Sequence, residues 1–134
     1  MAGRGSRLRP HTFTTAKPLV KIAGKSILAQ LIKDAVKLVD EPIEEMAFIV
    51  GDESFFGIEI IQELKLLAQK YDSDATIYRQ LNPLGTGHAI MCAEKSLSGK
   101  ALVIYPDTLI KTNESFDKEA DAVIWTKEVE NPEA

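Results

Sequence analysis

Residues 46–51 read MAFIVG, and this short apolar run is the strongest indication of the fold class. An apolar run that is closed by a glycine is typical of a strand covered on both faces of a sheet. Similar runs follow at 75–79 (ATIYR), 101–105 (ALVIY) and 121–127 (DAVIWTK). The sequence therefore predicts a sheet whose first recognisable strand is 46–51.

Helical patterns separate most of these runs. Ser26 is placed to cap a helix over 27–39, where apolar residues recur at intervals of three and four. Further helices are predicted over 54–71 and over roughly 86–96. Because strands that alternate with helices are joined by right-handed crossovers, we expect an α/β fold with a mostly parallel sheet.

Composition narrows the classes of protein. The chain has 134 residues, of which 45% are hydrophobic and 27% charged, and this favours one globular domain. A formal charge of -4 argues against a nucleic-acid partner. No apolar run approaches the length of a membrane span and no secretory signal opens the chain, so we expect a cytoplasmic protein without a membrane partner.

In an open parallel sheet, ligands bind beyond the carboxyl ends of the strands. The segment QLNPLGTGHA follows the second run at 80–89, and Pro106-Asp107-Thr108 follows the third. Asp107 has two equal interpretations, as a magnesium ligand or as a turn cap that acts through Thr108. His88 is interpreted as an incidental surface residue.

The opening stretch AGRGSR at 2–7 offers glycine amides, a hydroxyl and an arginine, a combination that suits phosphate. It lacks the Gly-Lys-Ser/Thr ending of an ATPase loop, and a disordered basic leader is the alternative. Lys17 also has a simpler interpretation, as a solvated loop lysine.

Taken together, the motifs resemble a known family. The stretch AGRGSRLRPHTFTTAKPLVKIAGKSIL at 2–28 is similar to the signature of the sugar-1-phosphate nucleotidyltransferases, and RQLNPLGTGHAI and LVIYPDT resemble two further segments of that family. The resemblance implies a Rossmann-like three-layer sandwich. It also implies the transfer of a nucleoside monophosphate from an NTP to a sugar 1-phosphate, with Mg²⁺ as cofactor.

The resemblance assigns roles residue by residue. Arg7 would bind the phosphates that leave as pyrophosphate, Lys17 would neutralise charge on the α-phosphate, and Asp107 would hold magnesium, so these three are the expected catalytic residues. The expected nucleotide-binding residues are Ala2, Gly3, Gly5, Ser6, Arg7, Gln80, Gly85 and Thr86. Among them, Gln80 and the Gly85 backbone would read the base.

Two departures from the family pattern shape the expected domain. Members carry a hydrophobic strand before the glycine loop and continue well beyond VENPEA, which closes this sequence. We therefore expect residues 1–134 to be the nucleotide-binding part of a single catalytic domain, truncated and inactive on its own. The alternative is a non-catalytic nucleotide-binding or regulatory module of the same fold.

The substrates are expected at the level of class. Glucose 1-phosphate is the first expectation for the acceptor, with dTTP or UTP as the nucleotide, and GTP with mannose 1-phosphate stays open. Whether the protein forms a homo-oligomer is also open.

Overall fold

The structure is a computed structural model, and it describes residues 19–22, 24–39, 41–108, 110–112, 117, 119–126 and 128–130. Its centre is a parallel pair of strands, β3 (Glu45–Val50) and β4 (Asp74–Arg79). The register runs from Glu45 opposite Asp74 to Val50 opposite Arg79, so both strands end at the same level. The predicted parallel sheet is confirmed by this pair.

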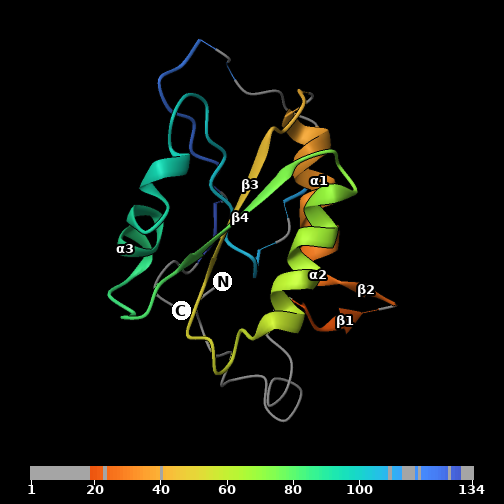
Figure 1. Cartoon of the computed structure of the whole chain (residues 1–134). Helices are drawn as coiled ribbons and strands as arrows, with labels where there is room; N and C mark the ends of the chain where they lie inside the picture. Colours follow the sequence, from red (N-terminus) through yellow and green to blue (C-terminus); the bar gives the residue numbers. More distant parts are fainter. Residues whose placement is uncertain are drawn as a thin grey trace.

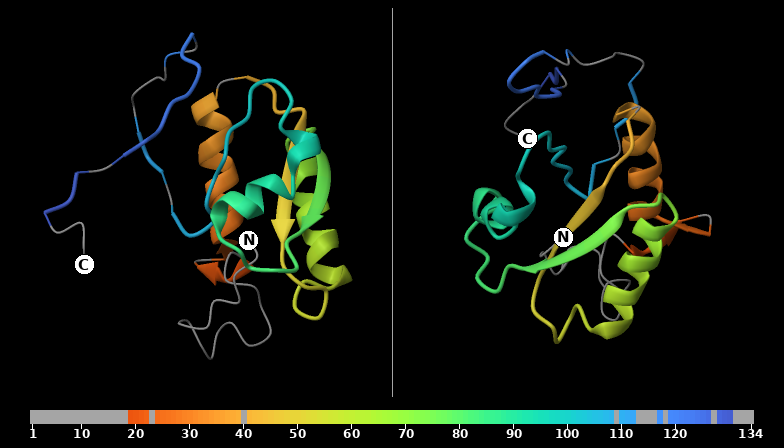
Figure 2. Two further views of the ribbon diagram at one scale, coloured as in Figure 1. Left: turned by 90° about the vertical axis from the view of Figure 1, so that its left-hand side faces the viewer. Right: turned by 45° about the horizontal axis from the view of Figure 1, so that its top comes forward.

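Helices lie on both sides of this pair. Helices α1 (Ile27–Val39) and α2 (Ile58–Gln69) lie on one face, and α3 (Thr86–Met91) lies on the other (Figures 1 and 2). A 3-10 helix, η3 (Glu94–Ser96), follows α3. The result is a three-layer α/β arrangement, as the family resemblance implies.

Helix α1 begins where the sequence places it. The Ala29 backbone N–H donates to Ser26 Oγ over 3.1 Å, which satisfies one of the amide groups that an N-terminus leaves without a partner. Just before it, β1 (Lys21–Ile22) and β2 (Lys25–Ser26) form a small antiparallel ribbon that the sequence analysis does not predict. Gly24 turns this ribbon at a φ of +80°, a conformation that glycine adopts without strain.

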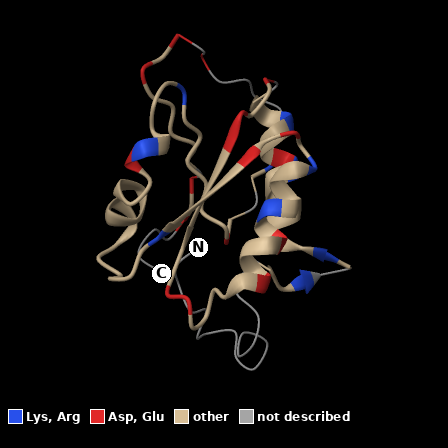
Figure 3. Cartoon of the chain, in the orientation of Figure 1, with Lys and Arg blue, Asp and Glu red and all other residues tan. Residues whose placement is uncertain are grey.

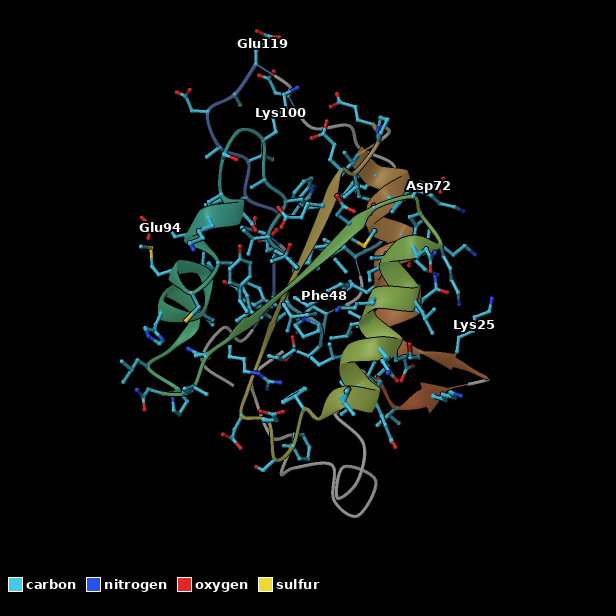
Figure 4. All side chains as sticks on the ribbon, viewed as in Figure 1. Lys25, Phe48, Asp72, Glu94, Lys100 and Glu119 are labelled. Carbon is cyan, nitrogen blue, oxygen red and sulfur yellow. The ribbon has the colours of Figure 1, made fainter. Side chains whose placement is uncertain are left out.

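The core lies between the sheet and the helices α1 and α2. Alternate residues of β3 point into it, and Figure 4 shows Phe48 near the middle of the molecule. Buried members of this cluster are Leu19, Leu28, Leu31, Ile32, Met46, Phe48, Val50, Phe56, Leu64, Leu67 and Ala68. The predicted helix stripes of α1 and α2 thus supply most of the side chains that cover β3.

One expectation about β3, that both of its faces are covered by apolar side chains, is wrong. The run 46–51 predicts a strand covered on both sides, but Ala47 is exposed and Ile49 only half-buried. On this face Tyr78 pairs with Ser96 Oγ over 2.7 Å, and Ser96 Oγ donates to Glu45 Oε1 over 2.9 Å. Polar contacts to η3 therefore take the place of a second apolar layer over part of the strand.

Helix α2 is shorter than the predicted helix over 54–71. Residues 52–56 form a turn in which the Phe56 N–H donates to the Asp52 carbonyl over 2.9 Å. Gly57 then has extended backbone angles, φ -72° and ψ -174°, which end that turn before the helix starts. Phe56 still enters the core, with only 1% of its surface exposed, but from the loop rather than from the helix.

The predicted strands at 101–105 and 121–127 are wrong for the described residues. Neither segment forms a strand, and Val103 and Ile124 are 48% and 83% exposed. A strand exists only when a neighbour completes its hydrogen bonds, and no described strand pairs with either segment. Part of the 101–110 segment instead lies along α1, where Leu102, Ile104 and Ile110 share an apolar groove with Leu31.

Candidate functional site

The carboxyl ends of β3 and β4 meet at one edge of the sheet. Gln80, the first residue after β4, donates its N–H to the Val50 carbonyl, the last residue of β3, over 2.8 Å. The segments 51–57 and 80–86 therefore start side by side. Loops that leave neighbouring parallel strands in this way form the edge at which open α/β sheets bind ligands.

Arg79, the last residue of β4, holds the loop that follows β3. Its Nη1 donates to the Gly51 carbonyl over 2.9 Å and its Nη2 to the Phe56 carbonyl over 3.1 Å. The planar guanidinium has donors in a fixed fork, so one side chain can hold both ends of the 51–56 turn. Sequence reasoning takes Arg79 only as the end of a strand, because nothing local in ATIYR indicates the carbonyls it contacts.

Gln80 is the predicted base-reading residue, and its side chain is buried, with 7% exposed. Its Nε2 lies 3.0 Å from the Gly85 carbonyl oxygen and 3.0 Å from His88 Nδ1. The first contact closes the loop that runs from the end of β4 to the start of α3. The structure thus brings Gln80, Gly85 and His88 together.

The loop turns into α3 at Gly85. This residue has φ +103° and ψ 178°, a region that side chains other than glycine rarely occupy. The loop residues Leu81 and Leu84 are 66% and 72% exposed, and Thr86 is also exposed. Because residue 85 is a glycine, its backbone can accept the hydrogen bond from Gln80 and also lead directly into α3.

Asp107 lies on an exposed turn. The Thr108 hydroxyl donates to Asp107 Oδ1 over 3.3 Å, and the Thr108 N–H donates to the Tyr105 carbonyl over 3.3 Å. The contact expected of a turn cap is therefore present, although a long one, and a magnesium role stays a prediction. Among the described residues, no cluster of three or more His, Cys, Asp or Glu side chains could hold a metal by itself.

Several predicted site residues lie outside the described residues: Ala2, Gly3, Gly5, Ser6, Arg7 and Lys17. Their roles stay predictions. His88 is the functional candidate that the sequence analysis misses. The spacing from Gln80 to His88 in the sequence is only a weak indication of this contact, because the two side chains meet only when the loop between them closes.

The apolar groove between α1 and the segment 102–110 is separate from this edge. It is lined by Leu31, Asp34, Ala35, Leu38, Leu102, Ile104 and Ile110, none of which belongs to the loops after β3 and β4. Figure 3 shows basic and acidic residues interspersed along α1 and α2, so the described part of this face mixes both charges. No helix in the described part of the chain is long and apolar enough to cross a membrane.

The chain is similar in sequence to several known proteins. The low-salt glycan biosynthesis nucleotidyltransferase Agl11 of Haloferax volcanii is 37% identical over 98% of this chain and 37% of its own length. The bifunctional protein GlmU of Methanococcus maripaludis is 29% identical over 98% of this chain and 29% of its own length. A glucose-1-phosphate thymidylyltransferase of Streptomyces antibioticus is 33% identical over 77% of this chain and 27% of its own length.

The chain thus spans between a quarter and two fifths of the length of these relatives. The sequence profile described as nucleotidyl transferase matches residues 1–132, which is nearly the whole chain. Together with the parallel α/β arrangement and the glycine-containing loop after β4, this match shows that the chain belongs to the nucleotidyl transferase family.

Proposed function

We propose that this chain supplies the nucleotide-binding part of an enzyme that transfers a nucleoside monophosphate from an NTP to a sugar 1-phosphate. The observation that carries the proposal is the closed loop from Gln80 to Gly85 at the carboxyl end of β4, in a chain whose family match covers residues 1–132. This loop is where the resemblance expects the base. The products are a nucleoside diphosphate sugar and pyrophosphate.

The reaction needs positioning and charge neutralisation more than a protein nucleophile. A phosphate oxygen of the sugar 1-phosphate attacks the α-phosphorus of the NTP and forms the new P–O bond. The bond between the α-phosphorus and the oxygen bridging to the β-phosphorus breaks, and pyrophosphate leaves with that electron pair. Arg7 binds the departing phosphates and Lys17 neutralises the α-phosphate during the attack.

The base and the triphosphate of the nucleotide are then bound by different residues. Gln80, the Gly85 backbone and Thr86 bind the base end, whereas Ala2, Gly3, Gly5 and Ser6 present the opening loop to the phosphates. Because backbone amides and an arginine are strong donors for phosphate oxygens, this loop complements the triphosphate.

Asp107 would hold Mg²⁺. Its carboxylate is exposed, and Mg²⁺ is usually bound by one or two carboxylates together with phosphate oxygens, so this residue fits the ion. When bound, Mg²⁺ neutralises phosphate charge.

The substrates belong to the same proposal. Glucose 1-phosphate is the proposed acceptor, with dTTP or UTP as the nucleotide. One relative is named a glucose-1-phosphate thymidylyltransferase, which supports this choice.

Pyrophosphate release by the full-length protein tests the proposal. Each of UTP, dTTP, GTP, CTP and ATP is paired with glucose 1-phosphate or mannose 1-phosphate in the presence of Mg²⁺, and pyrophosphate is measured with a coupled assay. We expect release with glucose 1-phosphate and dTTP or UTP, and no release when the sugar phosphate is omitted. A folded protein that releases no pyrophosphate with any pair contradicts the proposal.

A further inference from the structure

The orientation of the Gln80 amide is fixed by the group it faces. The Gly85 carbonyl oxygen, 3.0 Å away, can only accept a hydrogen bond. If the amide were turned over, two carbonyl oxygens would face each other at this distance without a proton between them. Gln80 Nε2 is therefore the atom that faces Gly85, and this orientation of the amide is assigned from its hydrogen-bond partner.

The second hydrogen of the Gln80 amide is donated in a hydrogen bond to His88. Its Nδ1 lies 3.0 Å from Gln80 Nε2, and since Nε2 is a donor, Nδ1 must accept. The ring proton of His88 is then on Nε2. His88 lies on α3 and is half-buried, so its ring has less rotational freedom than a fully exposed side chain.

Both hydrogens of the Gln80 amide are thus engaged within the protein. The atom that remains for a ligand is Oε1, which only accepts, and no hydrogen bond to it is found among the described residues. An acceptor at the centre of the Watson–Crick edge suits the N3–H of uracil or thymine and the N1–H of guanine. Cytosine N3 and adenine N1 place a lone pair at that position instead.

We propose that His88 is a positioning residue for nucleotide selection: its Nδ1 holds the Gln80 amide with Oε1 as the acceptor for the N–H at the centre of the Watson–Crick edge. The inference rests on the proposed function, in which Gln80 reads the base. It assigns the substrate class to uracil, thymine or guanine nucleotides and disfavours cytosine and adenine nucleotides.

The test compares matched variants of the full-length protein. His88→Phe keeps an aromatic ring but removes the acceptor, whereas His88→Asn places an amide oxygen near the position of Nδ1. Met91→Ala is the control, because Met91 is on the same helix and 58% exposed. For each variant, kcat and KM are measured for UTP against CTP, for dTTP against dCTP, and for GTP against ATP.

We expect His88→Phe to lower the preference for the uracil or thymine nucleotide by about tenfold, which is the effect of one lost hydrogen bond. The loss should lie chiefly in KM, and His88→Asn should recover most of the preference. Met91→Ala should keep it. A wild-type preference for CTP or ATP, unchanged selectivity in His88→Phe, or an equal loss in both His88 variants would overturn the inference.

Gln80→Ala separates this inference from the proposed function. If Gln80→Ala leaves base preference unchanged, the base-reading role fails and the positioning role fails with it. If Gln80→Ala lowers the preference but His88→Phe does not, only the positioning role fails. Nitrogen-15 spectra give a readout that needs no catalysis: we expect His88 Nδ1 to be unprotonated and Nε2 protonated, and a proton on Nδ1 would contradict the proposed contact.

Discussion

Arg79 Nη1 donates a hydrogen bond to the Gly51 carbonyl over 2.9 Å, so the last residue of β4 is tied to the first residue after β3. The same guanidinium holds the Phe56 carbonyl over 3.1 Å. The loop after one strand is therefore shaped by a side chain from its neighbour.

Replacing the Arg79 guanidinium should destabilise the 51–56 turn. Arg79→Met keeps the apolar stem and removes both hydrogen bonds, so we expect the free energy of unfolding of the full-length protein to fall by about 1–3 kcal/mol. Arg79→Lys keeps the charge but has no planar fork to span both carbonyls, and it should give an intermediate loss. Urea unfolding of the three proteins measures the difference, and equal stability of Arg79→Met and wild type would contradict the bracing role.

Gly85 should tolerate no side chain. Because its φ is +103°, Gly85→Ala should cost about 1–3 kcal/mol in backbone strain and raise the KM for the nucleotide by moving the Gln80 contact. Gly87→Ala is the matched control, since it lies inside α3 and an added Cβ meets nothing within 4 Å. There alanine should stabilise the helix by roughly 0.5–1 kcal/mol. Thermal unfolding and nucleotide titration distinguish the two variants.

Helix α2 offers a matched pair for the core. Leu64 is fully buried and Leu66, two residues on, is 60% exposed. Leu64→Ala should lower the free energy of unfolding by about 2–5 kcal/mol, because it removes buried methyl groups and leaves a cavity. Leu66→Ala should change it by no more than about 0.5 kcal/mol. Denaturant titration measures both, and similar losses would mean that the helix packs differently.

The proposed cations can be tested by turnover. If Arg7 and Lys17 neutralise charge that grows on the phosphates, Arg7→Ala or Lys17→Ala in the full-length protein should each lower kcat on the order of 100-fold. Lys33→Ala is the control, because Lys33 is an exposed lysine on α1. Near-normal turnover in Lys17→Ala would remove Lys17 from the proposed catalytic residues.

The two interpretations of Asp107 give different results. If its carboxylate binds magnesium, Asp107→Asn should raise the Mg²⁺ concentration needed for half-maximal turnover by about tenfold or more. Thr108→Val, which removes the 3.3 Å contact to Asp107 Oδ1, should leave that concentration within about twofold. If Asp107 only caps the turn, Asp107→Asn should leave the magnesium dependence unchanged. Titration of turnover with Mg²⁺ separates the two.

Several elements could be predicted from the amino-acid sequence alone. The stripe of α1, the Ser26 cap, the strands β3 and β4 and their parallel pairing all follow from side-chain period and connection type. The family likewise follows from short motifs along the chain. The stripe and the cap depend on residues a few positions apart, and the parallel pairing follows from the helical connection between the two strands, so periodicity and element order are enough to predict them.

Other contacts depend on partners that are distant in sequence, and these could not be predicted without the folded structure. The apolar run 101–105 has the composition of a strand, but strand formation needs a neighbour's backbone, and the described segment instead lies against α1. Arg79 contacts carbonyls 23 and 28 residues before it, and His88 meets Gln80 only because the loop between them closes. Such contacts are set by where the folded backbone brings atoms together in space, which no local pattern of residue types specifies.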